Sequence, residues 1–96
     1  MILDDIKTCL RIKNSSFDTE INDLISACQN DLMLSGIIQD KALDVTDPLI
    51  KRAIIVYCKA YFGFDNPDAD RLQESYKMLK MHLCLSSIYG GDLDAI

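Results

Sequence analysis

Residues 47–90 read DPLIKRAIIVYCKAYFGFDNPDADRLQESYKMLKMHLCLSSIYG and decide the fold, because they contain two apolar segments with clear starts. Asp47-Pro48 and Asn66-Pro67 are typical helix starts. The Asp or Asn side chain accepts a hydrogen bond from an unpaired backbone N–H, and proline at the first helical position loses none. Gly63 is a typical stop. The stretch predicts consecutive helices over residues 48–62 and 67–87.

The first of these helices is apolar almost all round. One face carries Ile50, Ala53, Ile54, Tyr57, Cys58 and Tyr61, and the opposite side carries Ile55, Val56, Ala60 and Phe62. A helix of this kind lies at the centre of its fold or is shared with a neighbouring subunit.

The second helix carries two apolar stripes. The first, which we expect to face the core, is made of Leu72, Tyr76, Leu79 and Leu83. The second is made of Met78, Met81, Leu85 and Ile88. Either both stripes form one wide buried face, or the second stripe is a partner surface, for which adaptable methionine side chains are suited.

The N-terminal half predicts two more helices. Residues 3–12 place Leu3, Ile6 and Leu10 on one face. After a polar break, Ser15 or Ser16 can cap a second helix that ends at Gly36. Its apolar face is made of Ile21, Leu24, Ile25, Cys28 and Leu32. The apolar residues of segment 37–47 show no sustained periodic spacing, so this segment is expected to form a loop with at most one helical turn.

The expected architecture is all-α, a small bundle of four helices with short connections and one longer loop at about residues 36–47. Residues 1–88 are expected to form a single domain, and residues 89–96 an acidic C-terminal tail. The chain has 96 residues, of which 49% are hydrophobic and 26% charged. No apolar run approaches the roughly 20 residues of a membrane span, so no membrane partner is expected.

No cofactor or metal site is predicted. Asp40, Asp44 and Asp47 share one loop, but the glycine and the closing glutamate of a calcium loop are missing. Four cysteines occur without a C-x-x-C pair, beside a single histidine, His82. The cysteines fit small buried hydrophobic residues better than zinc ligands or a disulfide framework.

The chain is not expected to be an enzyme, because it lacks the spacing motifs of nucleophilic, phosphate-binding and metalloprotease sites. Its net charge of −5 disfavours binding to a DNA duplex, and its basic residues are interleaved with acids along the sequence. A small helical DNA-binding regulator and a generic helical adaptor remain the alternative functions.

The order of these segments resembles the small head-tail connector proteins of tailed bacteriophages and prophages. The resemblance rests on the opening Leu3-Asp4-Asp5-Ile6-Lys7 helix, the Asp-Pro-x-Ile-Lys start at 47–51 and the aromatic pair Tyr61-Phe62. It also rests on the closing pattern Leu72-x-x-Ser75-Tyr76-x-x-Leu79-x-x-x-Leu83. The chain departs from the commoner pattern in having Tyr61-Phe62 where a tryptophan is usual.

The resemblance implies a structural subunit that forms a homo-oligomeric ring of about a dozen copies beneath the portal protein. Such a ring extends the DNA channel and provides the surface for tail attachment, so its partners are the portal, a tail-side completion or terminator protein, and further copies of itself. DNA passes through without sequence-specific binding. The implied location is the virion head-tail junction, and the bacterial host cytoplasm during assembly.

Three sets of residues are hypotheses for function in such a ring. Contact between subunits is assigned to Ile55, Val56, Met78, Met81, Leu85 and Ile88. Docking onto the portal or the adjacent subunit is assigned to the tail residues Tyr89, Asp92, Leu93 and Ile96. Asp40 and Asp44 are placed toward the channel, where their carboxylates would repel DNA; a loop outside the channel is the alternative.

Overall fold

The computed structural model describes residues 2–62 and 67–86 and is all-α, as the sequence predicts. Five helices follow one another: α1 (Ile2–Leu10), α2 (Asp18–Leu34), α3 (Gln39–Ala42), α4 (Pro48–Tyr61) and α5 (Ala69–Leu85). The short α3 is the single helical turn that the loop prediction allowed.

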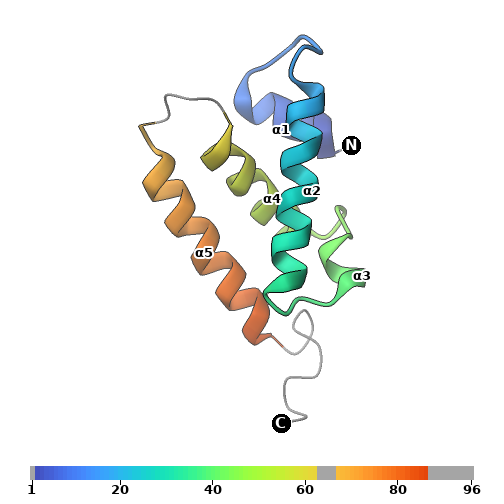
Figure 1. Cartoon of the computed structure of the whole chain (residues 1–96), viewed down its shortest axis with the longest axis vertical. Helices are drawn as coiled ribbons and strands as arrows, with labels where there is room; N and C mark the ends of the chain where they lie inside the picture. The colour runs from blue at the N-terminus through green and yellow to red at the C-terminus, as the bar shows by residue number, and fades with distance from the viewer. Residues whose placement is uncertain (1, 63–66, 87–96) are drawn as a thin grey trace.

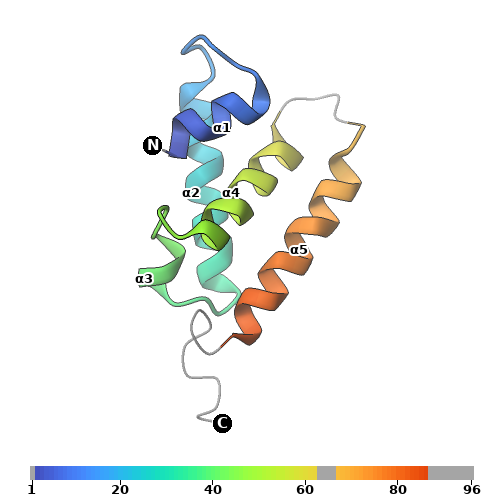
Figure 2. The same cartoon turned by 180° about the vertical axis from the view of Figure 1, so that it is seen from behind.

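Helix α4 lies at the centre of the fold (Figures 1 and 2) and packs against α1, α2 and α5. Buried residues lie on several sides of this helix: Ile50, Ala53, Ile54, Val56, Cys58 and Ala60. This explains why the segment is apolar on nearly every side. The partners of α4 supply matching residues, among them Ile6 from α1, Ile21 and Leu32 from α2, and Tyr76 and Leu83 from α5.

The start of α4 is the predicted cap. One carboxylate oxygen of Asp47, Oδ1, accepts hydrogen bonds from the backbone N–H groups of Leu49 and Ile50, at 2.9 and 3.3 Å. Pro48 occupies the first helical position. Two of the otherwise unpaired donors of the helix are thereby satisfied.

Removing this cap should destabilise the protein measurably. We expect Asp47→Ala to lower the free energy of unfolding by about 1 kcal/mol, because the two N–H groups lose their acceptor. Asp47→Asn keeps an acceptor oxygen and should recover most of that loss. Chemical denaturation followed by circular dichroism measures both, and equal losses in the two variants would contradict the capping role.

Helices α1 and α2 both end in a Schellman motif, in which a residue with positive φ reverses the chain. In α2 this residue is the predicted stop, Gly36, with φ of 114°. In α1 it is Arg11, with φ of 61°, whose N–H donates to Thr8 while the N–H of Ile12 donates to Lys7. The first helix therefore ends at Leu10 rather than at Ile12, because Arg11 leaves the right-handed region.

Two predicted helix starts are wrong. Helix α2 begins after Phe17 rather than Ser15 or Ser16, and its N-terminus has no side-chain cap. The ring of Phe17 instead packs edge-on against Phe62, with 5.4 Å between centroids. Helix α5 begins after Asp68, two residues later than expected, again without a side-chain cap; Asn66 lies outside the described residues.

Candidate subunit interface

The second stripe of α5 is exposed in the monomer. Met78, Met81 and Leu85, here called the α5 stripe, have 57%, 55% and 75% of their surface accessible. On the neighbouring face of the helix, Tyr76 and Leu83 are buried as predicted. The interpretation that both stripes form one buried face is therefore wrong for these three residues. Ile88 lies outside the described part of the chain.

A shallow depression of about 420 Å³ lies beside the stripe, at the seam between α4 and α5. It is lined by Leu49 of α4 and by Met78, Leu79, His82 and Leu83 of α5. Leu49 is itself 47% exposed. Exposed apolar side chains gathered in this way are typical of surfaces that bind another protein.

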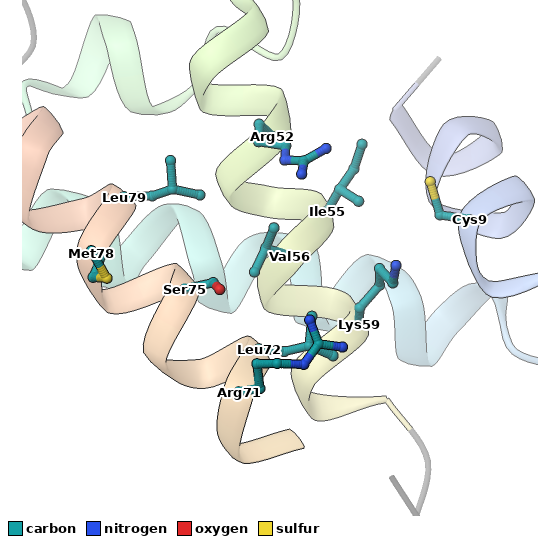
Figure 3. A pocket seen from close by; sticks show the side chains of 10 residues that line it. All are labelled: Cys9, Arg52, Ile55, Val56, Lys59, Arg71, Leu72, Ser75, Met78 and Leu79. Carbon is teal, nitrogen blue, oxygen red and sulfur yellow. The ribbon is translucent and has the colours of Figure 1, made fainter. Parts of the chain in front are cut away.

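A second hollow, here called the α4–α5 groove, adjoins the first and shares Met78 and Leu79 with it. Its volume is about 490 Å³. Figure 3 shows side chains from three helices around it, with Cys9 on α1, Ile55 and Val56 on α4, and Leu72 and Ser75 on α5. The two hollows together extend along most of the α4–α5 seam.

The α4–α5 groove is basic. Its charged lining residues are Arg52 and Lys59 from α4 and Arg71 from α5. Although the basic residues are interleaved with acids along the sequence, folding gathers these three. Arg52 and Lys59 are seven residues apart and therefore share one helical face, which is the signal that sequence reasoning missed. Arg71 joins them because α5 packs against α4.

The two predicted contact residues of α4 differ in accessibility. Ile55 is half-buried and lines the α4–α5 groove, whereas Val56 is only 7% exposed and belongs to the core cluster. Contact of Val56 with a neighbouring subunit would therefore be limited to the small part of its surface that lines the groove.

A polar cluster fixes α5 against α2. The hydroxyl of Tyr76 donates a hydrogen bond to Oδ2 of Asp31 at 2.6 Å, and Lys80 Nζ lies 2.9 Å from the same oxygen. The thiol of Cys28 lies 3.7 Å from the Tyr76 hydroxyl. Together with the packing of α5 on α4, this cluster holds the rotation of α5, on which the exposure of the α5 stripe depends. Burial, more than the contact with Asp31, raises the pKa of Tyr76, which therefore stays protonated as the donor.

Burial alone would raise the pKa of Asp31, but the hydrogen bonds from Tyr76 and Lys80 outweigh burial and hold it below its ordinary value of 3.8. A carboxylate whose pKa is lower in the folded state stabilises the fold above its unfolded pKa. This stabilisation is lost as the pH falls through the folded pKa. We expect Asp31→Asn to lower the free energy of unfolding at neutral pH by about 1 to 2 kcal/mol.

A denaturation series from neutral to acidic pH measures this effect. The loss caused by Asp31→Asn should shrink toward low pH, where the native carboxylate is also neutral. Asp40→Asn is the matched control, because it removes the charge of an exposed carboxylate and should change stability by less than about 0.5 kcal/mol. A loss for Asp31→Asn that stays constant across the series would contradict the ionic role.

The two loop aspartates have different environments. Asp40 is exposed in the first turn of α3. Asp44 instead accepts hydrogen bonds from the N–H and the hydroxyl of Thr46, and these hydrogen bonds lower its pKa. Asp40 thus has the more accessible carboxylate, while that of Asp44 closes the turn that leads to Asp47.

The cysteines divide into two kinds. Cys28 and Cys58 are buried, and burial raises the pKa of each thiol to about 12, so both stay protonated and unreactive. Cys84 is half-buried with its thiol 3.2 Å from the carbonyl of Ser35. Cys9 is exposed, so the expectation of burial is wrong there. Within residues 2–62 and 67–86, no three metal-binding side chains lie together.

The predicted docking residues Tyr89, Asp92, Leu93 and Ile96 lie outside the described residues. Among the residues described, none of the helices is long and apolar enough to cross a membrane.

Comparison with known proteins identifies the family to which the chain belongs. The family model described as "Phage connector protein" matches residues 2–90, which includes all five helices and both hollows. No match was found among the curated proteins or among the solved structures. The connector family is a structural one that implies a place in the virion. Since the match spans nearly the whole chain, the protein belongs to the phage connector protein family.

Proposed function

We propose that this protein is a head-tail connector subunit that forms a ring beneath the portal, extends the DNA channel and provides the tail-attachment surface. The observation that carries the proposal is the exposed α5 stripe on a chain of the connector family. A chain of 96 residues has enough apolar residues for its own core, so three large apolar side chains left on one helix face indicate a partner.

The proposed ring needs two different faces on each subunit. A closed ring requires a heterologous interface, in which two different patches of the same chain meet. The α5 stripe and the half-buried Ile55 are assigned to one of these patches. The tail, residues 89–96, is assigned to contact with the portal or with the adjacent subunit.

The charge of the chain suits a channel through which DNA must pass. With a net charge of −5, the subunit does not attract the phosphate backbone as a duplex-binding protein does. We place the exposed carboxylate of Asp40 toward the channel, where it would repel DNA and prevent the channel wall from binding it. The turn closed by Asp44 would hold this segment in position.

Deleting the reading frame from its phage or prophage tests the proposal. After induction, electron microscopy should show DNA-filled or emptied heads and complete but separate tails, and supplying the protein in trans should restore joined particles. Joined, infectious particles in the deletion strain would overturn the proposal and favour a small regulator or a helical adaptor.

A further inference from the structure

The α4–α5 groove combines positive charge with an apolar floor. Among the described residues no acidic side chain lines it, whereas Arg52, Lys59 and Arg71 all contribute to it. Arg71 forms an exposed ion pair with Asp68, at 3.3 Å, and pairs of this kind contribute little. Arg52 has no ion pair within the described part of the chain. The groove therefore offers cationic hydrogen-bond donors to an acidic ligand.

The size and the floor of the groove favour a peptide over a nucleic acid. Its volume of about 490 Å³ falls within the range of about 300 to 1,000 Å³ of sites that hold small ligands. Its floor is apolar, with Ile55, Leu72 and Leu79 among the lining residues. A phosphate backbone gains nothing from such a floor, whereas a peptide that alternates acidic and apolar side chains uses both parts.

The chain itself contains such a peptide. Residues 92–96 read Asp-Leu-Asp-Ala-Ile, in which two carboxylates alternate with apolar side chains. In an extended chain, alternate side chains point to opposite sides. Asp92 and Asp94 would thus lie on one side, toward the basic rim, and Leu93 and Ala95 on the other. The segment matches the groove in charge and in apolar character.

We infer that the α4–α5 groove of one subunit receives residues 92–96 of a neighbouring copy. This inference rests on the proposed ring, because groove and tail are two different surfaces whose pairing from chain to chain gives the heterologous contact that a ring requires. The shared residue Met78 connects the groove with the α5 stripe, so one neighbour can cover both.

The far end of the α4–α5 groove, which Arg71 lines, is at the limit of reach of the chain's own tail. Fifteen residues separate Arg71 from Ser86, the last described residue, which corresponds to about 22 Å along the helix. The six residues from Ser86 to Asp92 span about 20 to 22 Å when fully extended. The chain's own tail must therefore turn back and stay fully stretched to bring Asp92 level with Arg71. A tail that arrives from another copy has no such constraint.

The exposed thiol of Cys9 lines the groove and provides a direct test. Ala95→Cys places a second thiol in the tail, and Cys84→Ser removes the half-buried thiol as background. Particles assembled with this variant are treated with a bis-maleimide of short spacer length. We expect a ladder of covalent multimers on a denaturing gel, and linked peptides that join residue 9 to residue 95.

Matched variants test whether the cross-linked multimers arise from a tail bound in the groove. Cys9→Ser should abolish it. R52E/R71E should lower the cross-linking yield by about tenfold or more, because two favourable charge pairs become repulsive. Adding D92K/D94K to R52E/R71E should restore the yield, which a merely unfolded groove would not allow.

Each remaining outcome overturns the inference. Cross-linked monomer without multimers would mean that the chain's own tail occupies the groove. A ladder that is insensitive to R52E/R71E would mean that the tail lies elsewhere. Particles that need the protein yet give no link between residues 9 and 95 would refute the inference and leave the connector function intact. Joined particles in the deletion strain would refute the function itself.

Discussion

Replacing Met81 and Leu85 by aspartate is expected to separate heads from tails while leaving the subunit folded. Both side chains are more than half exposed in the monomer, so the helical circular dichroism signal and the melting temperature should change little. At a subunit contact, each new carboxylate becomes buried without a partner and costs about 2 kcal/mol or more, so the association constant should fall roughly 10³-fold.

The measurement combines two readouts. Electron microscopy of particles from a deletion strain complemented with M81D/L85D should show unjoined heads and tails. The matched control is S26D/A27D, which adds the same two charges to exposed positions of α2 and should support joined particles. If M81D/L85D loses its helical signal, the stripe is part of the core; if it folds and joins heads to tails normally, the stripe is not a contact surface.

Truncating Ile54 should strongly destabilise the folded protein. Ile54 is completely buried in the central helix α4, which packs against three other helices. We expect Ile54→Ala to lower the free energy of unfolding by about 2 to 5 kcal/mol, from lost transfer energy and the cavity left behind. This is a large part of the roughly 5 to 15 kcal/mol that stabilises a typical domain.

Urea denaturation of the purified protein measures this loss. Leu85→Ala is the matched control, since it also truncates a four-carbon apolar side chain but at a position that is 75% exposed. Its free energy of unfolding should stay within about 0.5 kcal/mol of the parent. Similar losses in the two variants would contradict the placement of α4 at the centre and of Leu85 at the surface.

Most of the fold could be predicted from the sequence because its signals are local. The Asp47-Pro48 start, the Gly36 stop and the spacing of Tyr76 and Leu83 each depend on neighbours within one or two helical turns. One prediction that failed involves a partner far away in the chain. Phe17, the residue before α2, packs on Phe62, which no local rule connects with the start of that helix.

The candidate interface was only partly predictable for the same reason. The spacing of the apolar residues located Met78, Met81 and Leu85 on one side of a helix. The exposure of their side chains, however, depends on how α5 is rotated against its neighbours. That rotation depends on packing against α4 and on Asp31, which is 45 residues away from Tyr76 and 49 from Lys80. The basic groove likewise exists because the antiparallel helices α4 and α5 place Arg71 in the same lining as Arg52 and Lys59.

The most direct test of the connector assignment is a cryo-electron microscopy reconstruction of the neck of the assembled particle. We expect a ring of helical subunits directly beneath the portal, with α5 at each boundary between neighbours and the α5 stripe inside the contact. A neck without such a ring, or one in which Met81 and Leu85 of every subunit face solvent, would contradict it.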